Sequence, residues 1–194
     1  MRDVMTWYAV DGLDGSGKST AAAALREILE ERGRSVTLIS HPDPNTFSGR
    51  MSAKLLLKDG KPARLFAAAF LLVDILGSLK YKKNAGTDDI IFIRYTLSAA
   101  YLPDRFVKPV YNLVTCILPS ADVSIYLDVD ETDALSRIEC RGGKTETFEN
   151  YEDMCNVRRK MRSISHGWHI VDKDLDEEGV KELLGKLVAS SISD

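Results

Sequence analysis

Residues 12–20 read Gly12-Leu13-Asp14-Gly15-Ser16-Gly17-Lys18-Ser19-Thr20 and fit the pattern G-x-x-x-x-G-K-[ST]. The glycines let successive backbone N–H groups turn toward one point without Cβ clashes, so the loop forms a nest for an anion. The apolar residues 7–10 predict a buried strand before it, and residues 20–32 predict a helix after it. Strand, glycine loop and helix together predict a phosphate-binding loop, because the helix N-terminus adds its positive dipole end.

The pattern is the Walker A motif, which predicts a site for ATP or a similar nucleotide. Lys18 is expected to reach the β- and γ-phosphates, and the Ser19 hydroxyl is expected to bind the Mg²⁺ that accompanies the nucleotide. We therefore expect the whole stretch from Gly12 to Thr20 to bind ATP, with Lys18 as a catalytic cation and Mg²⁺ as the cofactor.

The composition suits one α/β domain, residues 1–194, with a substantial core. A net charge of −3 argues against a broad nucleic-acid or anionic-lipid surface, and no apolar run is long enough for a membrane span. Cys116, Cys140 and Cys155 are too scattered for a disulfide framework or a zinc site, and we expect buried thiols. These features predict a soluble cytoplasmic protein without nucleic-acid or membrane partners.

Apolar stretches alternate with helical patterns along the rest of the chain. Further strands are predicted over residues 35–39, 88–93, 123–128 and 168–172. Helices are predicted over residues 49–57, 63–82, 96–101, 105–116, 131–141, 147–163 and 177–190. This order predicts an α/β fold with a five-stranded parallel sheet and helices on both faces. Ligands of such sheets bind at the carboxyl ends of the strands, where the loop after residue 39 and Arg94 are expected.

The predicted helix over residues 147–163 is acidic first and basic last, which complements the helix dipole. Its basic residues are expected to form a solvated face. They are Arg158, Arg159, Lys160 and Arg162.

The order of these signals resembles the thymidylate kinase family of P-loop nucleoside monophosphate kinases over nearly the whole chain. Residues 11–20 are similar to the family's phosphate loop, including the carboxylate of Asp14 inside it. Residues 41–50 resemble its F-P-[ED]-R-x-x-x-x-G segment, residues 65–68 its L-F-x-A motif, and residues 94–101 its D-R-[YH] stretch. Residues 126–141 look like its fourth strand and the approach to its lid.

The resemblance implies a P-loop NTPase fold with a short lid near residues 141–147, and ATP-dependent phosphoryl transfer to a nucleoside monophosphate. It implies that Arg94 and the lid residues Arg141 and Lys144 approach the phosphates, and that Arg137 lies against the adenine. It also implies a homodimer paired through helices on one face, for which the apolar residues 67–73 are suited. The acceptor-binding residues that it implies are Asp14, Pro42, Asp43, Phe66, Tyr95 and Tyr101.

Three positions depart from the family pattern. Ile93 stands where the family has an aspartate that helps to hold Mg²⁺ through water, and Pro44 and Phe70 stand where it has acceptor-site arginines. Each lost hydrogen-bonding partner of a polar ligand costs about 1–3 kcal/mol. We therefore expect an altered acceptor site, for which thymidylate itself is not assumed. Asp11 and Asp43 are the candidates to replace the missing carboxylate.

Two other functions stay open. A kinase that phosphorylates the hydroxyl of a nucleoside or another small acceptor would need a general base, for which Asp43 is the candidate. A non-catalytic nucleotide-binding regulatory protein would use the lid as a switch. Single residues also have structural interpretations: Arg94 in an ion pair with Asp43 or Asp11, Phe66 and Phe70 in the core, buried tyrosines at 95 and 101, and His41 at the surface.

Overall fold

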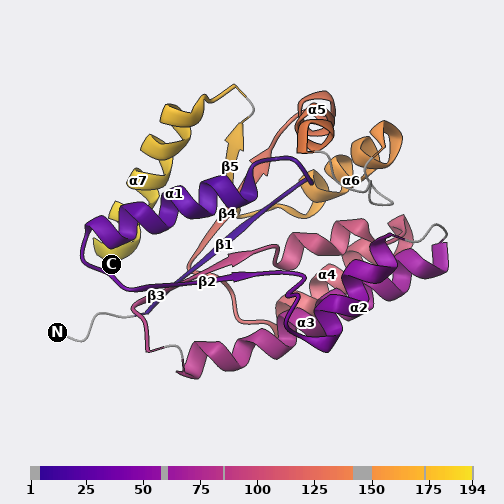
Figure 1. The fold of residues 1–194 in the computed structure, drawn as a ribbon, viewed down its shortest axis with the longest axis horizontal. Coiled ribbons are helices and arrows are strands. Elements are labelled where there is room, and N and C mark those ends of the chain that lie inside the picture. Colours follow the sequence, from indigo (N-terminus) through magenta and orange to yellow (C-terminus); the bar gives the residue numbers. More distant parts are fainter. Residues whose placement is uncertain (1–4, 58–60, 85, 142–149, 173, 194) are drawn as a thin grey trace.

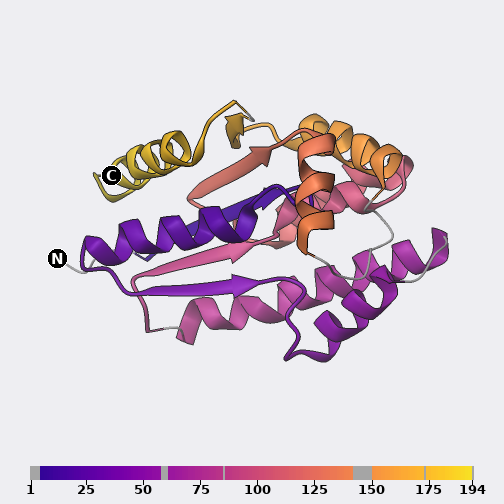
Figure 2. The same cartoon turned by 45° about the horizontal axis from the view of Figure 1, so that its top comes forward.

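The computed structural model describes residues 5–57, 61–84, 86–141, 150–172 and 174–193. Five strands form one sheet in the order β2-β3-β1-β4-β5 (Figure 1). Every neighbouring pair is parallel, so the carboxyl ends of the strands lie at one edge (Figure 2). The strands are β1 (Thr6–Gly12), β2 (Val36–Ser40), β3 (Asp89–Ile93), β4 (Val123–Asp128) and β5 (His169–Asp172).

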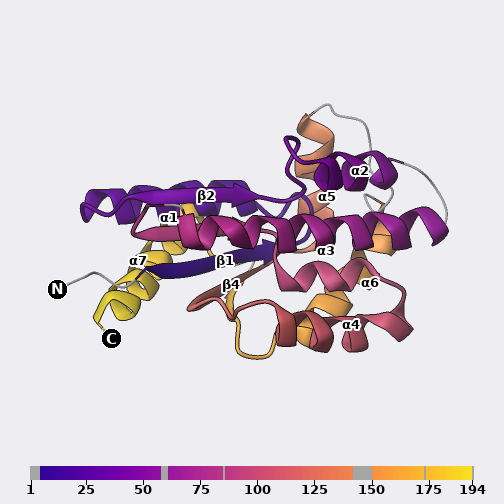
Figure 3. The ribbon, with the colours of Figure 1, turned by 90° about the horizontal axis from the view of Figure 1, so that it is seen from below.

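Helices cover both faces of the sheet, which confirms the predicted fold class. Helices α1 (Lys18–Glu31) and α7 (Glu177–Ser193) pack together on one face. Helices α3 (Lys61–Asn84) and α4 (Asp104–Ile117) cover the other face, and α2 (Phe47–Leu56) packs on α3 (Figure 3). A third apolar cluster lies beyond the carboxyl ends of the strands and includes the 3₁₀ helix η1 (Thr96–Tyr101), α5 (Glu131–Arg141) and α6 (Tyr151–Ile164). None of the helices in the described ranges could cross a bilayer.

The central strands lack hydrophobic alternation because both of their faces are covered. All seven residues of β1 and all five of β3 are buried. Trp7, Phe92 and Tyr95 form an aromatic group under α3 and α4, with the Trp7 and Phe92 ring centroids 4.8 Å apart. Burial on both faces explains the continuous apolar runs from which the strands were predicted.

The helical stretch predicted over residues 96–101 is a 3₁₀ helix, and the helix predicted over residues 147–163 is found from Tyr151 to Ile164, while its predicted start lies outside the described residues. The expectation of buried cysteines is wrong. Cys116 and Cys140 are exposed and Cys155 is half-buried. Cysteine is often buried as a residue type, but these three occupy outward positions of amphipathic helices, and position decides their exposure.

Arg158 is not part of a solvated face. Its Nε donates to Asp128 Oδ1 at 2.6 Å, and its Nη1 donates to Asp130 Oδ1 at 2.5 Å and to Glu131 Oε2 at 3.0 Å. Arg158 and Asp128 are both buried, and Arg162 makes a further ion pair with Asp128. The network joins the end of β4, the start of α5 and the middle of α6. It therefore fixes α5 and α6 relative to one another.

Replacement of Arg158 by Met is expected to lower the free energy of unfolding by about 3 kcal/mol, because it removes the buried cation shared by Asp128, Asp130 and Glu131 and, among the described residues, leaves the buried Asp128 only the exposed cation of Arg162. Arg159→Met is the control, because Arg159 reaches Asp104 only in an exposed pair, for which we expect a change under about 1 kcal/mol. Urea denaturation measures both. Equal losses in the two variants would contradict the structural role of Arg158.

Candidate active site

The glycine loop passes so close to neighbouring backbone that side chains do not fit. A Cβ on Gly15 would collide with the carbonyl oxygen of Ala134 in α5, and one on Gly12 would lie 2.6 Å from the carbonyl oxygen of Leu127. Gly15 and Gly17 have φ of 78° and 90°, in the left-handed region that glycine adopts without strain. Gly17 leads directly into α1, so the loop ends at that helix N-terminus.

Lys18 is buried and bonded to its own loop. Its Nζ donates to Leu13 O at 2.5 Å and to Gly12 O at 3.1 Å, and lies 3.5 Å from Asp14 Oδ1. Burial lowers the pKa of Lys18 to about 8, although Asp14 acts in the opposite direction. The ammonium charge therefore titrates near physiological pH.

Asp14 links Lys18 to Arg94 at the ends of two neighbouring strands. Arg94 Nη2 pairs with Asp14 Oδ1, and the Tyr101 hydroxyl donates to Asp14 Oδ2 at 3.1 Å. Burial acts to raise the pKa of Asp14, but Arg94 and Lys18 hold it below its usual range, so the carboxylate is ionised. The structure thus shows an ion pair of Arg94 with Asp14, whereas the structural interpretation from the sequence named Asp43 or Asp11. Arg94 adopts a left-handed φ of 65°, which is unusual outside glycine.

Asp11 and Asp43, the two candidates to replace a carboxylate at Ile93, bond to other groups. Asp11 is fully buried and accepts the backbone N–H groups of Gly12 at 3.0 Å and of Tyr95 at 2.9 Å. Burial raises the pKa of Asp11. Asp43 Oδ1 accepts the backbone N–H of Asn45 at 2.8 Å and its side-chain amide at 3.0 Å. Asp11 therefore ties β1 to the segment after β3, and Asp43 closes its own loop.

The remaining predicted acceptor residues separate into different places. Pro42 and Asp43 lie in the loop after β2. Tyr95 lies in the core beside Trp7, and its hydroxyl donates to Pro119 O at 2.7 Å, so only its backbone reaches the site. Phe66 is 58% exposed on α3 and is not part of the core, and Phe70 is half-buried against Phe47.

A cavity of about 520 Å³ lies on the α1 side of the glycine loop. Ser16, Gly17 and Arg137 line it together with residues of α1 and of the β5–α7 connection, and Arg137 Nη1 lies 3.5 Å from Gly15 O. The buried Ser16 hydroxyl has no hydrogen-bond partner in the part of the chain that the structure describes. The cavity is large enough for a nucleoside, and the unused Ser16 donor lies in its wall next to the glycine loop.

Two of the predicted catalytic cations, Arg141 and Lys144, fall at the end of α5 and after it. Arg141 is the last residue of α5, and its side chain and all of Lys144 lie outside the described residues.

Sequence reasoning missed a polar cluster beneath the loop after β2. His41, expected at the surface, is buried and bonded to Asp74. The signal was Asp74 itself, an acidic residue within a strongly apolar helical stretch, which requires partners when buried.

The family model for thymidylate kinase matches residues 10–184. A probable thymidylate kinase of Archaeoglobus fulgidus is 28% identical over 189 residues, which cover 95% of each chain. A probable thymidylate kinase of Methanosphaera stadtmanae is 31% identical over 168 residues, 81% of this chain and 83% of that protein. The structure of thymidylate kinase from Candida albicans superposes with a TM-score of 0.72 at 21% identity, covering 96% and 92% of the two chains, and supports the fold.

The affinity for ATP with Mg²⁺ is expected to fall as the pH rises above about 8. A polyanion binds the protonated form of Lys18, whose pKa is about 8, so binding above that pH must take up a proton. Well above the pKa the affinity should drop by up to about tenfold per pH unit. Titration calorimetry between about pH 7 and 9.5, in buffers of different ionisation enthalpy, measures the affinity and the number of protons taken up on binding. In Lys18→Arg, which keeps its charge, the decline should vanish.

Proposed function

The chain belongs to the thymidylate kinase family, and we propose that it transfers the γ-phosphoryl group of ATP to the phosphate of a nucleoside monophosphate through an altered acceptor site. The observation that carries the proposal is the group of Lys18, which is buried, and Asp14 and Arg94, which are half-buried, beside the glycine loop. It brings two cations to the carboxyl ends of β1 and β3, where the donor and acceptor phosphates of such an enzyme must meet.

In the proposed reaction, an oxygen of the acceptor phosphate attacks the γ-phosphorus while the bond to the bridging β–γ oxygen breaks, and ADP leaves. The acceptor oxygen is already ionised, so no general base is needed. Catalysis is then positioning and neutralisation of charge. The glycine loop and Lys18 hold the donor, and Arg94 is placed to hold the incoming phosphate. Asp14 keeps the two cations together by pairing with both.

For Mg²⁺, the chain offers the exposed hydroxyl of Ser19 at the start of α1. Both oxygens of Asp11 already accept backbone N–H groups, and Ile93 carries no carboxylate. We propose that Ser19 and the nucleotide phosphates hold the ion and that waters complete its shell, as Mg²⁺ commonly allows. When bound, the ion neutralises charge on the β- and γ-phosphate oxygens.

The altered acceptor site is inferred from Pro44 and Phe70. Pro44 contributes no cation, and its carbonyl accepts a bond from Arg50 at 3.3 Å. Phe70 meets Phe47 edge to face with ring centroids 6.3 Å apart. Two arginines that the family uses for the acceptor are thus replaced by apolar side chains. We expect an acceptor whose base is bound less by charge and more by shape than thymidylate is in the family.

The proposed partner of this chain is a second copy of itself. The outward side of α3 is apolar over several turns, where Phe66, Ala69, Val73 and Leu76 recur at helical spacing and are exposed. On α4, Leu113 and Ile117 are also exposed. Exposed apolar stripes of this kind are typical of interfaces between subunits.

A purified sample should convert ATP to ADP only when an acceptor is present, as measured by a coupled assay over all common nucleoside monophosphates and nucleosides. Lys18→Ala should lower kcat/KM by at least about a hundredfold, because it removes a cation from the transition state. Lys54→Ala, at an exposed position of α2, should change it little. No turnover with any acceptor would refute the proposal and favour a regulatory nucleotide-binding role. A preference for nucleosides that depends on Asp43 would favour a hydroxyl kinase.

Val73→Glu combined with Leu76→Glu is expected to convert a dimer into a monomer, because it places charges on the apolar side of α3. Ala23→Glu, on an exposed position of α1 across the sheet, is the control and should leave the mass unchanged. Light scattering after size exclusion measures both. A monomeric unsubstituted protein would contradict the proposed partner.

A further inference from the structure

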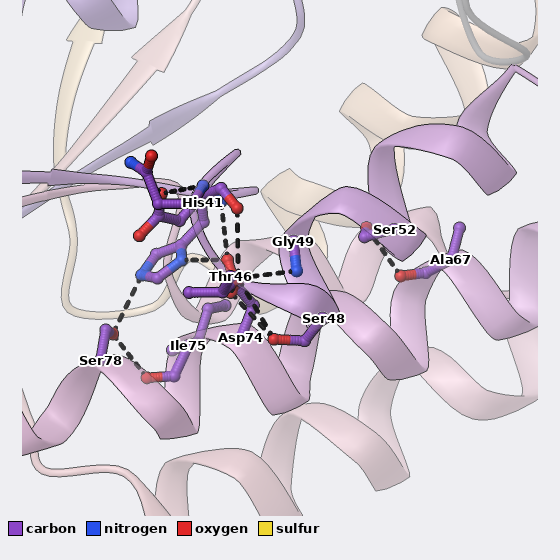
Figure 4. Close-up of polar contacts among 11 residues, drawn as sticks. His41, Thr46, Ser48, Gly49, Ser52, Ala67, Asp74, Ile75 and Ser78 are labelled. Carbon is purple, nitrogen blue, oxygen red and sulfur yellow. Dashed lines mark hydrogen bonds and ion pairs between the residues drawn. The ribbon is translucent and has the colours of Figure 1, made fainter.

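A buried polar cluster lies where α3 passes beneath the loop after β2. Figure 4 shows the His41 side chain pointing from that loop toward Asp74 and Ser78 of α3. All three side chains are polar and yet buried, and the α3 residues around them are mainly apolar. Buried polar groups persist only where they are hydrogen-bonded, so the cluster must be satisfied internally.

Asp74 accepts four hydrogen bonds from the segment that starts at His41. Its Oδ2 accepts from His41 Nδ1 and from the Asp43 backbone N–H, each at 2.8 Å. Its Oδ1 accepts from Ser48 Oγ at 3.0 Å and from Thr46 Oγ1. Burial acts to raise the pKa of Asp74, but these bonds lower it below its usual range. One ionised carboxylate thus holds the whole loop and the first turn of α2.

The bonds continue into α2. Thr46 Oγ1 accepts the backbone N–H of Gly49 at 2.9 Å and so caps the helix. A Cβ on Gly49 would collide with the Asp43 carbonyl and lie 2.6 Å from the Asp43 nitrogen, so the loop backbone packs directly against α2. The conformation of the loop is therefore set by Asp74 on one side and by α2 on the other.

The arrangement of Ser78, His41 and Asp74 has the order of a nucleophilic triad but not its accessibility. Ser78 Oγ lies 3.1 Å from His41 Nε2 and donates to the Ile75 carbonyl at 2.6 Å within α3. Ser78 is buried, and its hydroxyl hydrogen is already donated to the helix backbone and not to His41, so the serine is not activated as a nucleophile. The geometry is that of a tether and not of a covalent catalyst.

The bonds of His41 and Asp74, which we call the tether, are linked to the proposed acceptor site by a hydrogen bond from His41 to β3. The backbone N–H of His41 donates to the carbonyl of Ile93 at 3.0 Å, directly before Arg94. The loop that carries Pro42 and Asp43 therefore lies beside the cation proposed to hold the acceptor phosphate. A shift of that loop would change the space available to the acceptor and leave the glycine loop in place.

We propose that Asp74, acting through His41 and the Asp43 backbone, is a positioning residue for the acceptor: it fixes the loop of residues 42–46 beside Arg94. The inference rests on the proposed function, because it assigns the loop to the acceptor. Asp74 itself touches no substrate. Its replacement should therefore alter the acceptor KM and spare the KM for ATP.

The test compares Asp74→Ala and Asp74→Asn with Ser52→Ala. Ser52 is buried and donates to the Ala67 carbonyl at 2.9 Å, so it also joins α2 to α3 but does not touch the loop (Figure 4). In Asp74→Ala the KM for dTMP, and for the best acceptor of the nucleotide panel, should rise by about tenfold or more, since several bonds to the loop are lost. The KM for ATP should stay within about twofold of the unsubstituted protein's, and Ser52→Ala should leave both KM values unchanged.

Conservative substitutions at Asp74 and His41 should raise the acceptor KM less than alanine does. Asp74→Asn keeps the shape of the side chain and should raise the acceptor KM less than Asp74→Ala, and it remains measurable where the alanine variant does not fold. His41→Asn keeps an N–H donor near Nδ1 and should be milder than His41→Ala. Parallel rises in both KM values, or no change in the acceptor KM, would overturn the inference.

Hydrogen exchange provides a readout that needs no turnover. The Asp43 amide, which is bonded to Asp74, and the Gly49 amide should exchange at least about tenfold faster in Asp74→Ala than in Ser52→Ala. Unchanged exchange overturns the inference whether or not the enzyme turns over. If the unsubstituted protein phosphorylates no acceptor, the proposed function fails by itself, and accelerated exchange then supports the tether alone.

Discussion

The carboxylate of Asp14 lies between the buried ammonium of Lys18 and the half-buried guanidinium of Arg94, and the rest of the site depends on this balance of charge. Without it the two cations would repel one another, and their ionised forms would be costly to remove from water. Asp14 bonds to both, and Tyr101 donates to its second oxygen. The pair can form only because β1 and β3 are neighbours in a parallel sheet, so that the glycine loop and Arg94 leave the same edge.

The two halves of the site are held in different ways. The donor half consists mainly of backbone, and its glycines cannot be exchanged because Gly12 and Gly15 lie against the backbone of β4 and α5. The half assigned to the acceptor consists of a loop whose position is set by side chains, above all Asp74. Side-chain tethers can change without disturbing the sheet. This difference would allow a family member to keep its phosphate loop while residues of the other half change.

Local patterns predicted the fold well because the strands are apolar on both faces and the glycine loop marks the first crossover. They failed where burial is decided by residues far apart in the sequence. His41 bonds to Asp74, 33 residues away, and Arg158 bonds to Asp128, 30 residues away. A buried Asp74 indicates that a partner is needed, but no local pattern shows which residue it is. The Tyr95 backbone reaches the site while its ring turns back into the core, which a motif cannot reveal. The sequence shows that Ile93, Pro44 and Phe70 depart from the family pattern. How each departure affects the site depends on the residues that surround it in the fold.

The bonds of Lys18 to its own loop make the site selective among anions. The ammonium already has two carbonyl oxygens and a carboxylate as neighbours, so an incoming anion must replace them and gains only the difference. A small monovalent ion such as chloride offers little more than these oxygens do. A polyphosphate offers several charged oxygens at once, together with the loop N–H groups and the helix terminus. The loop thus resists occupation by the common ions of its solvent and responds to ligands of high charge density.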